Sequence, residues 1–594
     1  MTDDNTGLPG PDRSIEVGQP EPLTAPWSAP PEDVTTPVPV SPVDRPDALG
    51  KPPSRSGLRW GIALLVSILV VGIAAGAFYF VSGSTATSPL LADAPSDSLY
   101  YAELRPDLPG GQQQAVGDFL SAFPGFADRS QLEVKLSETF DRLIGRASND
   151  KYDYSTQIKP WFGGQIGLVQ PNLPIVSGTN HFLGLVLVTD ATKATDWIKS
   201  ILAGTTTTTE SYGGVTLTEG TRDQMTGAFG VKGEILLVGD LDSVKAGIDA
   251  ESKGSLRDND QLRSAAAALP GDHLAFVYVD NKGLLAWTRG QTALGGQSGQ
   301  LLADIQQCLS GDPSWTAVAV RADGSALVAE SATPKETVVV ARDSILSRLA
   351  PHLPASTVVA LDTNELGKFA LGTLDHCRSF PSIGTALKQI DPQVNALGGY
   401  AAYLGWIGDA GVVVTQENGT AYGGLVIVPA DKTGADRVVV QIKNLLALSG
   451  GAGIKVSDEP YAGTTITTIT VPGQVAGLPS AIDGAVFAVR DDVVVIGVQA
   501  AFVKAVLDTK PENSLASVDR YKQLVGRATD KNFGQLYIDL TAVREMIEKV
   551  APSGSLGAYE RDYKPYLVPF DAIAGSTWTD GGLIRGRFII GTNK

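Results

Sequence analysis

Histidine, cysteine and carboxylate side chains are the groups in this chain that could do chemistry. The four histidines are His181, His273, His352 and His376. No two stand at the spacing of a metal-binding pair, and the HExxH pattern is missing. Asp375, His376 and Cys377 are adjacent, but a catalytic triad is a spatial arrangement that neighbours in sequence rarely form. We therefore predict no catalytic residue, no metal site and no cofactor.

Two short motifs resemble parts of a serine acyl-transfer site. Ser148-Asn-Asp-Lys151 matches SxxK and Lys432-Thr-Gly434 matches KTG. The third element of that site, SDN, is absent, and the KTG opens a helical pattern where a strand is required. We interpret both as chance matches. Asn418-Gly-Thr420 is a formal glycosylation sequon without further support.

Four acidic residues recur at the end of a similar pattern, in which a turn precedes a short β-rich run. They are Glu103, Asp280, Asp362 and Asp539. A carboxylate at the start of a following helix accepts hydrogen bonds from free backbone N–H groups and interacts favourably with the helix dipole. We predict that all four are helix caps. The alternative is a carboxylate-dependent hydrolase, which would need two acids converging in one cleft.

Residues 60–81 form an uncharged apolar run, and a helix of about 20 such residues crosses a bilayer core. Lys51, Arg55 and Arg59 precede the run, whereas no Lys or Arg lies in residues 82–97. Basic residues stay in the cytoplasm. We therefore predict an uncleaved signal-anchor in the plasma membrane, with the N-terminus cytoplasmic and the large C-terminal part extracytoplasmic. Gly72 and Gly76 match the small-xxx-small pattern, which allows a homodimer through the span.

Residues 1–59 hold thirteen of the thirty-six prolines and one aromatic residue, Trp27. Such a segment buries too little apolar area to offset the entropy of ordering, so we predict a disordered cytoplasmic tail. An inert spacer and a phosphorylated or partner-binding tail both remain open.

Charge and cysteine content narrow the class of protein. The net charge is −17, so the basic footprint of a nucleic-acid-binding protein is absent. Two cysteines, Cys308 and Cys377, exclude a disulfide-dense scaffold. Both fall on the side where oxidation is permitted, but sequence cannot test their separation, and their pairing stays open.

The part after the span matches itself at an offset of 259 residues. Val244-Lys-Ala246 recurs as Val503-Lys-Ala505, and Asp280 as Asp539. Other landmarks follow in the same order with small changes of offset; these pairs are Trp161 with Trp406, Tyr278 with Tyr537, and Trp315 with Trp578. We predict a tandem duplication. After a linker at 82–92, one repeat occupies 93–335 and the other 345–594.

Apolar periodicity predicts the elements of each repeat. Leu132, Leu136, Phe140 and Ile144 keep helical spacing. Short β-rich runs on either side of residues 232–234, and of 490–492 in the second copy, are hairpin signals. The fold class is therefore α+β: a duplicated, mainly antiparallel sheet with helices covering one face, after one transmembrane helix and a disordered tail.

The chain resembles the bacterial DUF3352 family of membrane-anchored proteins. The motifs are Pro95-x-Asp-Ser-Leu-Tyr-Tyr101, residues 119–125 and 161–167, and the runs at 228–231 and 274–280. The resemblance implies an envelope protein without assigned catalytic or binding residues. Two hypotheses follow: a non-catalytic module that binds an apolar ligand or an envelope protein, and the hydrolase above. A large apolar cavity would favour the first.

Overall fold

The computed structural model describes residues 87–593, apart from gaps at 175–180, 223–224, 293–300, 302–303, 306, 310, 312, 336–341, 449–454, 471–483 and 552–555. All described residues belong to one compact unit, 55–594. We call 87–335 the first half and 342–593 the second half. The predicted tail, the span at 60–81, and Gly72 and Gly76 within it lie outside the described residues. Among the residues that the structure describes, no helix is long and apolar enough to cross a membrane.

The described residues of the first half form ten strands. They are β1 (Tyr100–Leu104), β2 (Phe162–Gln170), β3 (Leu183–Val188), β4 (Thr206–Tyr212), β5 (Val215–Arg222), β6 (Met225–Lys232), β7 (Ile235–Gly239), β8 (Ala275–Asp280), β9 (Trp315–Asp323) and β10 (Ala326–Pro334). Those of the second half in the same sheet are β12 (Thr357–Thr363), β13 (Ile407–Glu417), β14 (Thr420–Pro429), β15 (Lys455–Tyr461), β16 (Thr464–Thr470), β17 (Gly484–Val489), β18 (Val494–Gly497), β20 (Gly534–Asp539), β21 (Phe570–Asp580) and β22 (Leu583–Thr592).

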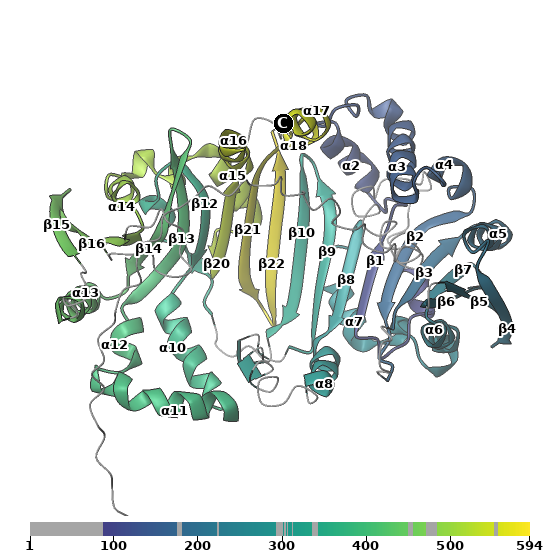
Figure 1. The fold of residues 1–594 in the computed structure, drawn as a ribbon, viewed down its shortest axis with the longest axis horizontal. Helices are drawn as coiled ribbons and strands as arrows, with labels where there is room; N and C mark the ends of the chain where they lie inside the picture. Colours follow the sequence, from purple (N-terminus) through teal and green to yellow (C-terminus); the bar gives the residue numbers. More distant parts are fainter. Residues whose placement is uncertain are drawn as a thin grey trace, which may run out of the picture. The chain divides into compact units, whose positions relative to one another are not determined.

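These strands form one sheet, and each pair in it is antiparallel. The spatial order in the first half is β4-β5-β6-β7-β3-β2-β1-β8-β9-β10. The second half has the corresponding order β15-β16-β17-β18-β14-β13-β12-β20-β21-β22. The last strand of each half, β10 and β22, pair along nine residues and join the halves at the centre of the sheet (Figure 1). A separate small sheet pairs β11 (Ile345–Leu346) with β19 (Lys531–Asn532).

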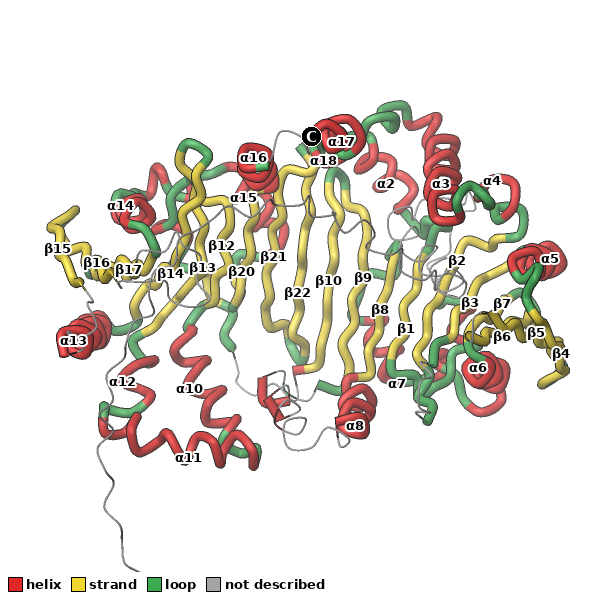
Figure 2. Tube along the Cα trace, in the orientation of Figure 1, coloured by secondary structure: helices red, strands yellow, loops and turns green. Residues whose placement is uncertain are grey.

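The described helices connect these strands. In the first half they are α2 (Gln112–Leu120), α3 (Leu132–Ser148), α4 (Tyr154–Gln157), α5 (Ala191–Ile201), α6 (Leu241–Lys253), α7 (Asp260–Ala267) and α8 (Asn281–Thr292). In the second half they are α10 (Leu366–Cys377), α11 (Pro381–Ala396), α12 (Tyr400–Leu404), α13 (Lys432–Leu448), α14 (Ala500–Leu507), α15 (Asp519–Ala528), α16 (Leu540–Val550), α17 (Leu556–Asp562) and α18 (Lys564–Leu567). Figure 2 shows them around the sheet.

Helices pack on both faces of the sheet, so the expectation of one covered face is wrong. On the back face, α6 and α7 of the first half share a core with Tyr278, and α14 and α15 of the second half share one with Tyr537. On the front face, α2, α3 and α5 pack on the strands that carry Ile166 and Val186. Strand β3 is buried along nearly its whole length. Its unbroken apolar run is typical of a strand covered on both sides.

Several expectations from periodicity and turns are confirmed. Helix α3 buries Leu132, Leu136, Phe140 and Ile144, and the residues at 232–234 connect the antiparallel pair β6–β7.

The predicted correspondence of Trp315 with Trp578 is wrong in strand register. Trp315 lies opposite Asp280, whereas Ala572 lies opposite Asp539; the two tryptophans therefore stand near opposite ends of β9 and β21. A shared residue type near a strand is a weak guide to structural equivalence, because strand register is set by the pairing of the strands.

Cys308 and Cys377 form a disulfide, with 5.2 Å between their Cα atoms. This separation is ordinary for such a bond. Both side chains are buried. The bond links the segment between α8 and β9 of the first half to α10 of the second, and it answers the question of pairing that the sequence left open.

Candidate functional site

A row of apolar residues crosses the front face of the sheet from one half to the other. Residues directly opposite each other on neighbouring strands point to the same face. In the first half the row contains Leu104, Ile166, Val186 and Leu236 on β1, β2, β3 and β7. In the second half the corresponding positions are Thr363, Ala410, Ile427 and Val494. The cross-strand row itself continues two residues further along the strands, through Leu361, Val412, Leu425 and Ile496 on β12, β13, β14 and β18. The two parts connect through Phe588 on β22, opposite Ala329 of β10.

The first-half part of the row is covered. Leu104, Ile166, Val186 and Leu236 are between 1 and 8 % exposed. Ile166, Val186 and Leu236 share a core with Val116 of α2 and with Leu132, Leu136 and Phe140 of α3. Burial of these side chains is the ordinary outcome for a sheet face backed by amphipathic helices.

The second-half part of the row is open. Leu361 is 53 % exposed, Val412 55 %, Ile496 38 % and Phe588 40 %. Helix α10 follows β12, as α2 follows β1, but α10, α11 and α12 extend past the lower end of the sheet in Figure 1. We call the surface formed by Leu361, Val412, Ile496 and Phe588 the open face; Leu425, in the same row, packs against the core around Trp406. Contiguous exposed apolar surface of this kind marks interaction and ligand-binding sites.

An apolar cavity of about 400 Å³ adjoins this side of the sheet. Its walls are α16, the α17–α18 region, and strands β21 and β22. The lining residues are Leu540, Val543, Arg544, Ile547, Tyr559, Leu567, Phe570, Ile573 and Ile590. Ile573 and Ile590 lie opposite each other, two residues along their strands from Gly575 and Phe588, so they share the front face with the open face. The cavity and the open face therefore form one continuous apolar surface.

Close packing on Gly575 keeps the bottom of this surface flat. The Phe588 ring lies directly on Gly575, where a Cβ atom would approach a ring carbon to 2.4 Å. Any larger residue at 575 would displace the ring.

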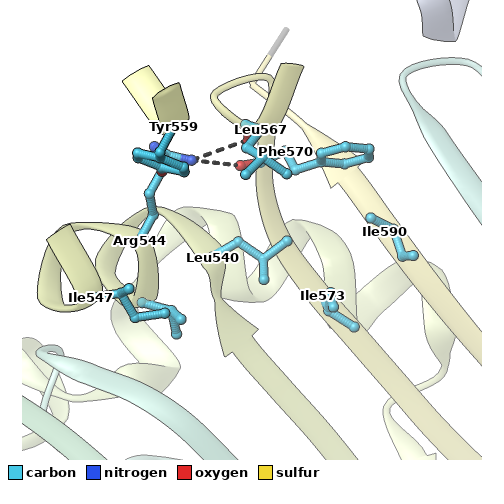
Figure 3. A pocket seen from close by; sticks show the side chains of 9 residues that line it. Leu540, Arg544, Ile547, Tyr559, Leu567, Phe570, Ile573 and Ile590 are labelled. Atoms are coloured by element: carbon cyan, nitrogen blue, oxygen red, sulfur yellow. Dashed lines mark hydrogen bonds between the residues drawn. The ribbon is translucent and has the colours of Figure 1, made fainter. Parts of the chain in front are cut away.

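Arg544 is the charged residue among those lining the cavity, and it lies near the cavity rim. Its Nη1 donates to the carbonyl oxygens of Leu567 at 3.2 Å and Phe570 at 3.4 Å. These bonds hold the segment before β21 against α16. The residues Leu540, Ile573 and Ile590, which also line the cavity, are apolar (Figure 3). An arginine beside an apolar cavity offers a cation where the acidic end of an apolar chain would emerge.

Two of the four recurring acids are helix caps, as expected. Asp280 accepts a hydrogen bond from the backbone N–H of Gly283 at 3.0 Å at the start of α8. Asp539 accepts one from Ala542 at 2.8 Å at the start of α16. This local motif was recognisable from sequence because the helix follows the strand directly.

Glu103 and Asp362 are buried strand residues and not caps, so that part of the prediction is wrong. Glu103 lies in β1 and accepts a hydrogen bond from the Tyr101 hydroxyl at 2.6 Å. Asp362 lies in β12 and accepts one from Ser347 Oγ at 2.6 Å. Burial raises the pKa of Asp362 to about 6. Both acids face the back of the sheet, because they neighbour Leu104 and Leu361, which face the front.

The nearest acid to Asp362 that affects its ionisation is Asp409. Asp409 accepts hydrogen bonds from the backbone N–H and the guanidinium of Arg348 at 2.9 to 3.1 Å. These bonds hold the pKa of Asp409 below its usual value against the opposing effect of its burial. Asp409 is thus fully engaged, and neither acid lines the front-face cavity. The pair is a structural network, and the hydrolase hypothesis gains no geometric support from it.

The other candidate residues are dispersed. His181 contacts Asp240 at 3.0 Å, and Cys377 is oxidised in the disulfide and cannot act as a nucleophile beside His376. Ser148 Oγ bonds within the end of α3, and Lys432 pairs with Asp491. Among the described residues, no group of three or more His, Cys, Asp or Glu could hold a metal ion.

An extensive antiparallel sheet with helices on both faces defines an α+β protein. The family model described as "Protein of unknown function (DUF3352)" matches residues 63–581. The chain belongs to this family, as the resemblance predicted.

No curated protein matches the chain significantly. Two crystal forms of TP0453 are similar over 43 % of this chain. The match covers 82 % of the form I chain at 8 % sequence identity and 84 % of the form III chain at 10 % sequence identity. The TM-score is 0.23 in both cases. A score this low carries no argument about fold or function.

Proposed function

We propose that this protein is a membrane-anchored extracytoplasmic module that binds an apolar chain, such as the acyl chain of a lipid, along the open face and in the adjoining cavity. The observation that carries the proposal is the contrast between the two parts of one front-facing cross-strand row. Leu361, Val412 and Ile496 are exposed, whereas Leu104, Ile166 and Leu236 are buried beneath helices. Exposed apolar surface on this scale is costly in water, and a bound acyl chain would remove the cost.

The cavity supports an acyl chain over a protein partner. Its volume of about 400 Å³ lies in the range of small-ligand sites, and it is walled by aliphatic and aromatic side chains. Arg544 at the rim would attract the carboxylate or phosphate at the end of such a chain. An envelope protein seated on the open face is the alternative occupant.

The anchor and its orientation belong to the same proposal. The uncharged run at 60–81 and the basic residues before it favour a single-pass protein with its N-terminal tail in the cytoplasm. The disulfide between Cys308 and Cys377 supports an oxidising, extracytoplasmic location for the folded part. Dimerisation through Gly72 and Gly76 stays a prediction of the small-xxx-small pattern.

We also propose that the folded part arose by tandem duplication. The two halves share one strand order, and matching side-chain contacts support common descent. Tyr212 donates to Asp249 at 2.7 Å, and Tyr461 donates to Asp508 at 2.6 Å. Such agreement in both topology and detail is hard to obtain from shared turn chemistry alone.

Photo-crosslinking tests the binding proposal. The purified full-length protein in mild detergent would be irradiated with a diazirine analogue of palmitic acid, and the labelled peptides identified by mass spectrometry. We expect adducts on β12, β13, β21 and α16. Val412→Asp places a charge in the contact and should lower labelling about tenfold. Val134→Asp is the matched control, because Val134 is similarly exposed, at 52 %, but lies on α3.

Two results would contradict the proposal. One is labelling spread evenly over the surface. The other is labelling that falls equally in Val412→Asp and Val134→Asp. Crosslinks from this region to another protein in intact membranes, with no lipid adduct, would instead favour the envelope partner.

A further inference from the structure

A second cavity, of about 640 Å³, lies on the back face of the first half. It is enclosed by β1, β8, α7 and the N-terminal turn η1 (Pro89–Ala92). Its polar lining comes from Glu103, Arg105, His273, Arg257 and Arg263. The cavity is separated from the open face by the thickness of the sheet and belongs to the other half, so it is a distinct site.

The inner wall carries a buried carboxylate that lacks a hydrogen-bond donor on one oxygen. The Glu103 side chain is 4 % exposed, and Tyr101 donates to its Oε2. Its Oε1 is buried and accepts no hydrogen bond; the nearest cation, Arg105 Nε, is 3.6 Å away and is bonded to Asp107. A buried carboxylate oxygen without a donor is costly, so a ligand that donates a hydrogen bond would be stabilised here.

His273 adds a second acceptor beside this oxygen. Its Nδ1 lies 3.0 Å from the Pro270 carbonyl oxygen, to which it donates. In the neutral ring Nε2 is then an acceptor, and it lies 3.9 Å from Glu103 Oε1. Two acceptors at this separation fit two neighbouring hydroxyl groups, each donating to one of them.

The outer rim is cationic. Arg257 lies in η3 (Leu256–Asp258) and Arg263 in α7, and both line the mouth. Arg257 makes no hydrogen bond or ion pair with the other described residues, whereas Arg263 pairs with Asp260. The cavity thus offers acceptors at its base and, at its mouth, a guanidinium that is hydrogen-bonded to no described residue, although its charge acts on Asp93 and Glu251. This arrangement suits phosphate or carboxylate outermost.

The second half shows what a filled version of this space looks like. Asp362 pairs with Gln535 as Glu103 pairs with Phe276. Tyr521, the counterpart of Leu262 at the 259-residue offset, fills the space there. Its ring packs at 5.2 Å from that of Tyr537, and its hydroxyl accepts a hydrogen bond from Gln535. A tyrosine is therefore accommodated at this position in the second half, where Gln535 stands in place of Phe276.

We infer that the back-face cavity of the first half binds a polyol or sugar carrying one anionic group, with hydroxyls on Glu103 and His273 and a phosphate or carboxylate at Arg257. The same chemistry exists in free polyol phosphates and in the headgroups of glycerol- or inositol-based phospholipids. Thr87 and Ser88 line the mouth, six residues after the end of the proposed span. A lipid headgroup source therefore rests on the proposed anchoring, whereas binding of a free polyol phosphate does not.

Calorimetric titration of the full-length protein in detergent micelles tests the inference, with glycerol 3-phosphate and inositol 1-phosphate as free probes and inorganic phosphate as comparison. We expect saturable binding of at least one polyol phosphate and at least about tenfold weaker binding of inorganic phosphate. Arg257 is exposed, so Arg257→Ala should fold normally. This substitution should weaken polyol phosphate binding about tenfold. Arg437→Ala, an exposed arginine of α13, is the charge-matched control and should change nothing.

Two further variants test the inner wall. Leu262→Tyr should abolish binding by filling the cavity as Tyr521 does. Glu103→Gln should weaken polyol phosphate binding but leave inorganic phosphate unchanged. Flotation with vesicles containing phosphatidylglycerol or phosphatidylinositol tests a lipid headgroup as the source. A headgroup is identified if the protein binds these vesicles, Arg257→Ala weakens the vesicle binding, and the free probes do not bind.

The inference is overturned if neither free probes nor vesicles bind saturably, or if Arg257→Ala and Leu262→Tyr both bind as wild type does. It is also overturned if inorganic phosphate binds as tightly as the polyol phosphates. Acyl-chain labelling at the open face should be unchanged in Leu262→Tyr, and polyol phosphate binding unchanged in Val412→Asp. The two proposals can therefore fail separately.

Discussion

Cys308 and Cys377 are joined by a disulfide although 69 residues separate them in the chain. Cys308 lies between α8 and β9 of the first half, and Cys377 is the last residue of α10. The bond therefore ties α10 of the second half to the segment before β9 of the first.

Loss of this disulfide should destabilise the folded part. In the chain-entropy model, closure of a loop of this length stabilises the native state by up to about 4 kcal/mol. Cys377→Ala should therefore lower the melting temperature in non-reducing thermal unfolding. The double variant Cys308→Ala/Cys377→Ala should match the single variant. A melting temperature indifferent to both substitution and reductant would show that the bond contributes nothing.

The ionisation of Asp362 should make stability depend on pH. Because burial raises its pKa to about 6 from 3.8, the folded state holds the proton more tightly than the unfolded state does. The resulting stabilisation is complete below pH 3.8 and is lost as pH rises through 6. The loss is at most about 3 kcal/mol.

Asp362→Asn should consequently flatten the stability profile between about pH 4 and 7 and raise stability at neutral pH. Denaturant unfolding across this range measures the effect. Asp519→Asn is the control, because Asp519 is fully exposed and pairs with Lys522 on the surface. A wild-type profile in Asp362→Asn would show that another group titrates.

The two capping acids should be structural. Asp539→Ala removes the acceptor for the Ala542 N–H and should cost about 0.5–2 kcal/mol. Asp539→Ser retains a capping oxygen and should recover most of the loss. Thermal unfolding of both variants measures this, and Asp280→Ala should behave as Asp539→Ala does. Unchanged or increased stability in both alanine variants would reopen the interpretation of these acids as catalytic.

Residues in the two parts of the front-facing row should tolerate truncation differently. Leu104→Ala removes a side chain that is 2 % exposed and should cost about 2–5 kcal/mol. Leu361→Ala, in the second-half part of the row and 53 % exposed, should change stability by about 0.5 kcal/mol or less. Urea unfolding compares the two. Equal losses would mean that the open face is covered in the folded protein by chain outside the described residues.

The orientation of the anchor can be tested in cells. If the tail is cytoplasmic, protease added to intact cells stripped of their wall should degrade the chain beyond residue 83 and spare a tag on the tail. Removal of the tag under these conditions would refute the orientation inferred from Lys51, Arg55 and Arg59. A cytoplasmic protein that leaks is the control for intact membranes.

Local signals predicted local structure well. The four-residue spacing of Leu132, Leu136, Phe140 and Ile144 predicted α3 because one face of a helix must meet the core. Asp280 and Asp539 were recognisable as caps because the helix begins at the next residue. The Asn418-Gly419 pair was interpreted only as part of a sequon, although it is also the turn between β13 and β14. Its positive φ angles of 52° and 75° are those that an Asn-Gly hairpin turn requires.

Sequence by itself determined the α+β class, the family, helix α3 and the hairpins β6–β7 and β17–β18, because these depend on periodicity and on turns within a few residues. Tertiary structure decided the sites. Glu103 and Asp280 end similar turn-strand patterns, yet only Glu103 is buried, because α7 and η1 cover the back of β1. Ile166 and Val412 are equally apolar in sequence. One is buried and the other exposed because α2 and α3 cover Ile166, whereas the helices that pack on the front of the second half cover Ala410 and Ile427 and not Val412. No local pattern records where a helix packs.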